Sequence, residues 1–280
     1  MTKNKWAIFS DVDGTIYSFP DKKLTAGNLE KIHELKEKDI PFILNTGNPP
    51  YKKIQNLADQ THAPYIVSSN GALVYDNINK KTIFIEKMPL EEVEKIWAIA
   101  DEINAMLYYF GTDQYYVKNM TKKWFDFLVD FTEYNEFQTH GKIVPDIHKI
   151  EVYGEPEDIE RFYNIAMKRN INLNIINLKT HIEITKYGIS KATGMAWVCK
   201  NVLNMDVQDA MAIGDSPNDI SMLEVSNYSY AMDNADDLTK KSAKFYTSDV
   251  EQSGLAEAID DYLYRTDFEL KRFVSQKGKK

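Results

Sequence analysis

Carboxylate side chains with short spacing directly follow an apolar run near the N-terminus. Asp11 and Asp13 come after the run Trp6–Ser10, and Gly14 allows the chain to turn there. A second acidic group, Gly214–Asp219 (Gly-Asp-Ser-Pro-Asn-Asp), follows another short apolar run. Crowded carboxylates repel one another and need a cation, and oxygen ligands with room for water suit Mg²⁺. A carboxylate can also attack phosphorus, and Asp13 can protonate a leaving-group oxygen, so these residues favour phosphoryl transfer.

A lysine and a threonine at two other positions suit the same chemistry. Lys191 opens a helical pattern within Gly188–Gly194, and Thr46-Gly47 follows the apolar run Pro41–Leu44. An ammonium group and a metal cation together can offset the negative charge on a transferring phosphoryl group. The stretch around the lysine superficially resembles a P-loop, but its lysine precedes the final glycine instead of following it, so we reject that interpretation.

Short apolar runs alternate with helical patterns in the first and last parts of the chain. The spacing predicts strands at 6–10, 41–44, 65–68, 210–213 and 228–231, and helices at 29–38, 51–58, 191–203, 220–225 and 254–264. This alternation is typical of a parallel sheet covered by helices, in which ligands lie beyond the carboxyl ends of the strands. The acidic groups, the lysine and the threonine should therefore meet at one edge of the sheet.

The middle of the chain has a different pattern, in which consecutive strands are joined by interposed helices. We expect strands near 81–86, 106–110, 114–117, 147–153, 173–177 and 181–184, and helices near 89–104, 122–134 and 157–168. Such an order indicates an α+β module with an antiparallel sheet. The predicted fold class is thus α/β: a Rossmann-like doubly wound parallel sheet core, residues 1–80 and 186–280, with an inserted α+β cap domain, residues 81–185.

These motifs resemble those of the haloacid dehalogenase (HAD) superfamily over nearly the whole chain. Asp11–Thr15 matches the first motif, DxDGT, and Thr46-Gly47 is similar to the second. Lys191 resembles the third-motif lysine, and Gly214–Asp219 resembles the fourth motif, GDxxND. The inserted module, roughly 82–184, falls between the second and third motifs, which resembles the type IIB cap of the Cof-like subfamily.

The resemblance implies a Mg²⁺-dependent phosphatase that forms an aspartyl-phosphate, and it implies a role for each matched residue. Asp11 would be the nucleophile, Asp13 the acid/base, and Lys191 a further catalytic group. The implied phosphate-binding residues are Val12, Thr46, Gly47, Lys191 and Asn218, and the implied metal-site residues are Asp11, Asp13, Asp215, Ser216 and Asp219. Whether Asp219 would contact the metal directly is open.

One position departs from the subfamily's pattern. The second motif there usually reads Thr-Gly-Arg, whereas this chain has Asn48 followed by two prolines. The departure bears on substrate preference rather than on the chemistry. The implied substrates are small phosphorylated metabolites such as sugar phosphates. Two alternatives remain: a phosphomutase, and a receiver-like or phosphate-binding module that does not turn over.

Composition limits the classes of partner. The 280-residue chain has a net charge of −8 and no basic face or tail, which argues against nucleic acid as the main partner. No apolar stretch of about 18 residues predicts a membrane span, and Met1–Trp6 has no signal-peptide pattern. The single cysteine, Cys199, excludes an intramolecular disulfide and suits the cytoplasm. Lys277–Lys280 is expected to be a solvated tail. Asn70-Gly71 is interpreted as a turn near the domain connection.

Overall fold

The computed structural model describes residues 6–18 and 22–277. Residues 1–5, which belong to the segment without a signal-peptide pattern, lie outside the described residues. Residues 278–280, which belong to the expected solvated tail, also lie outside them. The chain forms two compact units: unit 1 comprises 1–46, 58–67 and 191–280, and unit 2 comprises 47–57 and 68–190. The sequence-based domain ranges divide the chain differently at 47–57, 68–80 and 186–190, and they stay a prediction.

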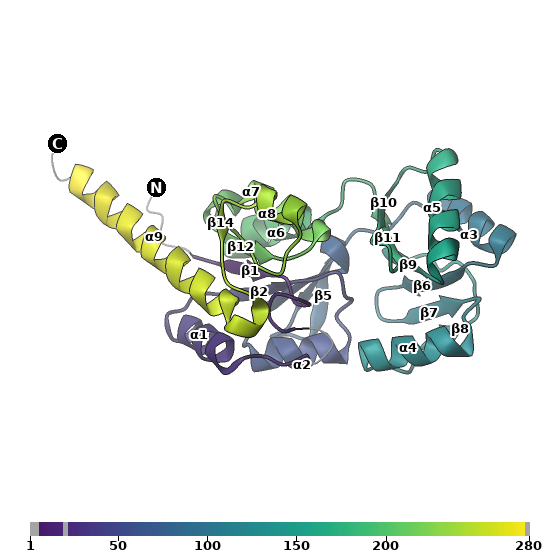
Figure 1. Ribbon diagram of the computed structural model, residues 1–280, viewed down its shortest axis with the longest axis horizontal. Helices are drawn as coiled ribbons and strands as arrows, with labels where there is room; N and C mark the ends of the chain where they lie inside the picture. Colours follow the sequence, from purple (N-terminus) through teal and green to yellow (C-terminus); the bar gives the residue numbers. More distant parts are fainter. Residues whose placement is uncertain (1–5, 19–21, 278–280) are drawn as a thin grey trace. The chain divides into compact units, whose positions relative to one another are not determined.

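Unit 1 contains a parallel sheet. The order is β14 (Phe245–Tyr246), β13 (Tyr228–Ala231), β12 (Met211–Gly214), β1 (Ile8–Ser10), β2 (Phe42–Asn45) and β3 (Tyr65–Ser68), and neighbouring strands are parallel. Figure 1 shows the helices around these strands: α1 (Ala26–Glu37), α6 (Lys191–Val198), α7 (Ile220–Val225), α8 (Asp237–Ser242) and α9 (Gly254–Lys277). Helix α2 (Lys52–Gln60) begins in unit 2 and ends in unit 1.

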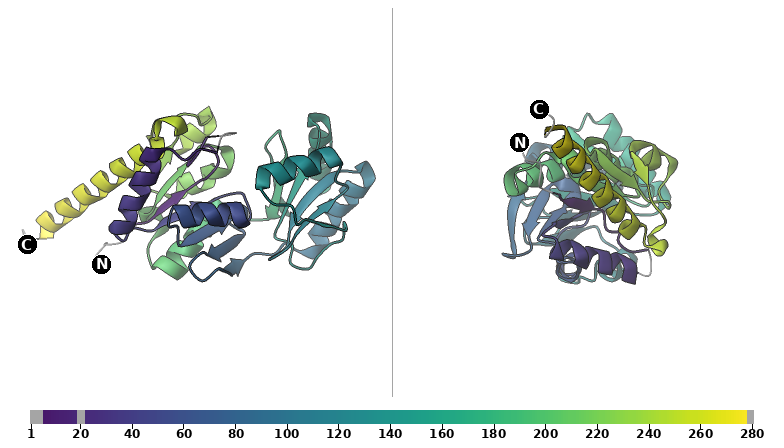
Figure 2. Two further views of the ribbon diagram at one scale, coloured as in Figure 1. Left: turned by 90° about the horizontal axis from the view of Figure 1, so that it is seen from below. Right: turned by 90° about the vertical axis from the view of Figure 1, so that its left-hand side faces the viewer.

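Helix α1 illustrates how the sequence builds this unit. The Thr25 side chain accepts a hydrogen bond from the Asn28 amide and so caps the helix. Ile32 and Leu35 are buried at helical spacing, while Asn28 accepts a hydrogen bond from the amide of Ala256 at 3.0 Å. Helix α1 therefore packs beside α9, as Figure 2 shows.

Unit 2 contains a second, mostly antiparallel sheet. Its order is β10 (Leu173–Asn177), β11 (Ile182–Lys186), β9 (Lys149–Tyr153), β6 (Met106–Phe110), β7 (Tyr115–Lys118) and β8 (Gln138–Thr139), and only the β7–β8 pair is parallel. The unit also holds the antiparallel pair β4 (Leu73–Asp76) and β5 (Lys81–Ile85), and the helices α3 (Leu90–Ile103), α4 (Lys122–Thr132) and α5 (Pro156–Lys168).

The two faces of this second sheet differ in chemistry. Ile150 and Val152 of β9 pack into an apolar core with Ile96 of α3 and Phe162 of α5. Because side chains alternate along a strand, Lys149, Glu151 and Tyr153 project from the opposite face. That face therefore carries polar groups that are nevertheless buried.

The structure confirms the predicted fold class and most of the expected elements, and Cys199 is buried as expected. The sequence patterns missed β4, β8, α8 and β14. These elements have six residues or fewer, which is too short for a period of two or of 3.6 to become evident. Within the described residues, no helix is long and apolar enough to span a membrane.

Candidate active site

Three adjacent strands of unit 1 end beside one another. Strand β1 pairs with β12 through Ser10 and Ile213, and with β2 through Ser10 and Leu44. Because the strands are parallel, the next residues of all three reach the same edge of the sheet. The residue after β1 is Asp11, and its amide donates to the Ile213 carbonyl at 2.9 Å.

Lys191 lies at the centre of the site. Its ammonium Nζ donates to Asp11 Oδ1 at 2.5 Å and to Asp219 Oδ1 at 2.6 Å, and the residue is only 1% exposed. The Asn45 side chain at the end of β2 donates to the Lys191 carbonyl at 3.2 Å, which fixes the start of α6. The sequence-predicted lysine and nucleophile are thus in direct contact.

Asp219 shapes the turn after β12 as well as binding Lys191. Its second oxygen, Oδ2, accepts from the amides of Asp215 at 3.0 Å and Ser216 at 2.9 Å. The Ser216 hydroxyl donates to Asn218 Oδ1 at 2.7 Å, and a methyl group at Gly214 would lie 2.3 Å from the Asp219 carboxyl carbon. Both oxygens of Asp219 therefore already have donors, and Asp219 is fully buried.

The turn after β1 carries Asp13 and leaves a space for Asp215. The carbonyl of Val12 accepts from the amides of Thr15 and Ile16, and Gly14 has a φ of +89°. A methyl group at Gly14 would lie 2.3 Å from Asp215 Oδ2, so only glycine leaves room for that carboxylate. The Thr15 hydroxyl donates to Asp215 Oδ1 at 3.1 Å and orients it.

The cluster is buried and carries surplus negative charge. Carboxylate oxygens of Asp11, Asp215 and Asp219 lie within 4.8 Å of one another. Burial, and then the Asp219 carboxylate, raises the pKa of Asp11 well above its ordinary value, against the lowering effect of Lys191. Burial and Asp219 likewise raise the pKa of Asp215 to about 7. One ammonium is therefore not enough to balance the three carboxylates.

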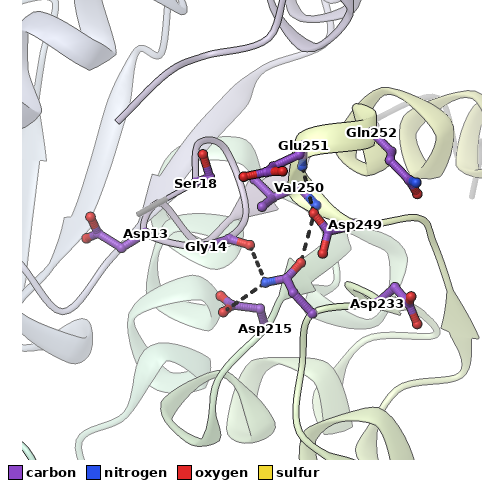
Figure 3. A pocket seen from close by; sticks show the side chains of 10 residues that line it. Asp13, Gly14, Ser18, Asp215, Asp233, Asp249, Val250, Glu251 and Gln252 are labelled. Atoms are coloured by element: carbon purple, nitrogen blue, oxygen red, sulfur yellow. Dashed lines mark hydrogen bonds between the residues drawn. The ribbon is translucent and has the colours of Figure 1, made fainter. Parts of the chain in front are cut away.

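A pocket of about 820 Å³ opens beside this cluster (Figure 3). Asp13, Asp215 and Ser18 line it, together with residues that follow β13 and precede α9. Among these, Asn234 donates through Nδ2 to the Gly14 carbonyl at 2.8 Å and to Asp215 Oδ2 at 3.3 Å. Asn234 thus joins the turns after β1 and β12.

Sequence reasoning missed Asn234, Thr15 and Asn45 as residues that shape the site. Asn234 follows β13 at the same sheet edge, so the rule that located Asp11 could have indicated it. Of the predicted residues, Thr46 follows β2 and its amide donates to the Val67 carbonyl at 2.8 Å. Gly47 follows directly and belongs to unit 2, where its carbonyl accepts from Lys149.

The residues present fit a hard divalent cation. The donor set is made of carboxylate oxygens, the ligand type that Mg²⁺ prefers, and the pKa values of Asp11 and Asp215 are raised by burial and then by neighbouring carboxylates, whose repulsion a cation would relieve. The glycine at position 14 preserves the space that the Asp215 carboxylate occupies. Asp11 and Asp215 are the best-placed ligands, because both oxygens of Asp219 have donors already.

Comparisons with known proteins identify the family of this chain. The model of the haloacid dehalogenase-like hydrolase family matches residues 8–259. A Bacillus subtilis relative, 5-amino-6-(5-phospho-D-ribitylamino)uracil phosphatase YcsE, is 25% identical over 90% of this chain and 93% of its own. Phosphoglycolate phosphatase of Methanosarcina acetivorans is also 25% identical, over 91% of this chain and 95% of its own.

A solved structure extends the likeness to the whole fold. The HAD subclass IIB sugar phosphatase BT4131 superposes with a TM-score of 0.82 at 20% identity, covering 92% of this chain and 99% of that one. The resemblance to the haloacid dehalogenase superfamily that the motifs indicated is confirmed, and with it the fold. This chain belongs to the haloacid dehalogenase-like hydrolases, in their Cof-like branch.

Proposed function

We propose that this hydrolase is a Mg²⁺-dependent phosphatase that cleaves small phosphate monoesters through an aspartyl-phosphate on Asp11. The observation that carries the proposal is the buried contact between Lys191 Nζ and Asp11 Oδ1, next to a surplus of carboxylates at the ends of parallel strands. The proposal is also supported by the family and by the relatives named phosphatases.

Two steps account for the reaction. Asp11 attacks phosphorus through a carboxylate oxygen, the bond from phosphorus to the ester oxygen breaks, and Asp13 gives its proton to the leaving alkoxide. Asp13 then takes a proton from water, the water oxygen attacks phosphorus, and the acyl–phosphate bond breaks to release inorganic phosphate and the free Asp11 carboxylate. The open pocket beside Asp13 gives water a route to the site.

The other residues of the site hold charge and geometry. Lys191 offsets negative charge on the phosphoryl oxygens and lowers the pKa of Asp11, against the effect of burial, which favours the ionised carboxylate. We assign Mg²⁺ to Asp11, Asp215 and the Asp13 backbone carbonyl; when bound, the metal would neutralise charge that develops on the phosphoryl group. Asp219 and Ser216 stabilise the turn that presents Asp215. Phosphate contacts are assigned to Val12, Thr46, Gly47 and Asn218 in addition to Lys191.

The substrate class follows from the relatives and not from a single residue. The named relatives are phosphatases of a phosphorylated ribitylaminouracil, of phosphoglycolate and of sugar phosphates. We therefore propose a small phosphorylated metabolite as substrate. The lone cysteine is compatible with a cytoplasmic enzyme.

The test is phosphate release from p-nitrophenyl phosphate and a panel of hexose phosphates and phosphoglycolate, with Mg²⁺ or with EDTA. Asp11→Asn should abolish release, because an amide is a poor nucleophile of nearly the same shape. Asp260→Asn, at a surface ion pair with Lys31, is the matched control and should retain it. Acid-quenched wild-type enzyme should carry a phosphoryl adduct on the peptide that contains Asp11.

Three outcomes would contradict the proposal in different ways. Release that persists in Asp11→Asn would exclude the covalent route. Phosphoryl return to another position of the sugar, without free phosphate, would indicate a phosphomutase. Mg²⁺ binding without turnover on any substrate of the panel would favour a phosphate-binding module.

A further inference from the structure

Lys149 is a buried lysine in unit 2, remote in sequence from every motif that predicted the active site. It is 0% exposed, on the polar face of β9, and its ammonium has three acceptors. It donates to the Gly47 carbonyl at 2.8 Å, to Glu151 Oε1 at 2.6 Å and to Glu183 Oε1. All these residues belong to unit 2. Besides the two carboxylates, the ammonium has the carbonyl of Gly47 as its third acceptor, and it lies 5.6 Å from the centroid of the Phe110 ring.

The two glutamates are fully occupied by donors. Glu151 Oε2 accepts from the Tyr153 hydroxyl at 2.9 Å, and Glu183 Oε2 accepts from the Asn70 amide at 2.6 Å. Although burial raises it, the pKa of Glu183 is held well below its ordinary value by the Lys149 ammonium and by His181. Glu151, Glu183 and His181 are spaced closely enough for a metal, but the Lys149 ammonium already binds both carboxylates. We call Lys149, Glu151, Glu183 and Asn70 the Lys149 network.

The contact with Gly47 has a geometric consequence. A peptide group is planar and trans, so the carbonyl of Gly47 and the N–H of Asn48 point in opposite directions. An ammonium fixed on that carbonyl therefore fixes the direction of the next N–H. The following carbonyl, that of Asn48, accepts from the Ser69 amide at 3.1 Å, and its side chain accepts from the Tyr51 hydroxyl at 2.8 Å. The segment directly after Thr46 is thus held from several sides.

The turn that supplies one of these contacts is itself under strain. Ser69, Asn70 and Gly71 have φ values of 52°, 55° and 92°, and a non-glycine residue in this region costs on the order of 1 kcal/mol. The Ser69 hydroxyl is 3.0 Å from His148 Nε2, and Asn70 is bound by Glu183. The Lys149 network therefore holds the strained turn and the Gly47 peptide at once. The sequence interpretation of Asn70-Gly71 as a turn near the domain connection did not include this link.

We propose that Lys149 is a positioning residue for the phosphate-binding segment Thr46-Gly47, acting through the Gly47 peptide. The inference rests on the proposed phosphatase function, in which this segment contacts phosphate. If it holds, loss of Lys149 weakens the binding of substrate phosphate and of free phosphate, while the chemistry at Asp11 continues.

The experiment separates affinity from turnover. Lys149→Met leaves two buried glutamates unpaired and can fail to fold, so a second variant, Lys149→Met/Glu151→Gln/Glu183→Gln, removes the charges together. Circular dichroism selects a temperature at which each variant is folded. We expect KM for p-nitrophenyl phosphate and Ki for inorganic phosphate to rise roughly tenfold, as for a lost hydrogen bond to a charged group, with kcat within about threefold.

Lys53→Met is the matched control. Lys53 is also a buried lysine of unit 2 that donates to a backbone carbonyl, but its acceptor is the carbonyl of Phe131, at 3.3 Å. Its KM and Ki should match those of the wild type. If the folded triple variant turns over substrate as the wild type does, with unchanged KM and Ki, this inference alone is overturned. An inactive wild-type enzyme would overturn it together with the proposed function.

Discussion

Lys191 in unit 1 and Lys149 in unit 2 are both buried between two carboxylates, yet their surroundings differ in charge balance. Around Lys191 a third carboxylate, Asp215, lies within 4.8 Å of Asp11 and Asp219. Burial and that crowding raise the pKa of Asp215 to about 7. Around Lys149 neutral donors complete the coordination of both glutamates. The larger surplus of negative charge marks the cluster that needs a cation and can do chemistry, whereas the cluster whose carboxylate oxygens are filled by donors supports geometry.

The largest expected effect would separate the two lysines by the kinetic constant that each controls. Lys191→Met should reduce kcat/KM about 10³-fold, mainly through kcat, because the ammonium stabilises charge that grows in the transition state. Steady-state kinetics on p-nitrophenyl phosphate measure this. Lys31→Met, a surface lysine paired with Glu34 and Asp260, is the control. If the Lys191→Met enzyme keeps kcat within a few-fold of the wild-type value, Lys191 would be a positioning residue like Lys149 and not a catalytic one.

The next effect compares two glycines that both have positive φ. Gly14→Ala should lower the free energy of unfolding by about 3 kcal/mol, since strain adds to a 2.3 Å clash with Asp215. Gly188→Ala in unit 2 meets nothing within 4 Å and should cost only about 1 kcal/mol of backbone strain. Urea unfolding of the two variants gives the difference. Equal losses would mean that the Asp215 carboxylate moves aside easily and that the space for it is not rigid.

The smallest effect concerns a buried polar group of unit 2 that we expect to act on folding alone. Burial lowers the pKa of His148 to about 3, opposed by Asp146 and reinforced by Lys149. The unfolded chain, with an ordinary pKa near 6.5, binds the proton more readily, so stability falls as the pH drops below that value. The wild type should lose about 2 kcal/mol more than His148→Gln between pH 7 and pH 5.

Urea unfolding at the two pH values measures that loss. His140→Gln, at an exposed position, is the control and should behave like the wild type. The same pH dependence in wild type and His148→Gln would show that His148 is protonated without opening the fold. The buried polar groups of unit 2 would then be held less rigidly than our comparison of the Lys191 and Lys149 clusters assumes.

The sequence predicted the residues of the surplus-charge cluster because each follows an apolar run and matches a motif. Asp11, Asp215 and Lys191 all lie at one sheet edge for that reason. Asn234 was missed, although it follows a predicted strand, because no motif marks it. Lys149 was missed for a stronger reason. Alternation along β9 makes its polar residues look solvent-exposed, and their burial depends on contacts far apart in sequence, such as that with Gly47.

The most direct test of the difference between the Lys191 and Lys149 clusters is a calorimetric Mg²⁺ titration. It compares the wild type with Asp215→Asn and with Lys149→Met/Glu151→Gln/Glu183→Gln. We predict that the wild type and the triple variant bind one Mg²⁺ with similar affinity. The affinity of Asp215→Asn for Mg²⁺ should be at least about tenfold lower, as expected when a charged ligand is removed. No Mg²⁺ binding by the wild type, or binding lost in the triple variant and kept in Asp215→Asn, would contradict the assignment of the cation to the Asp11–Asp215 cluster.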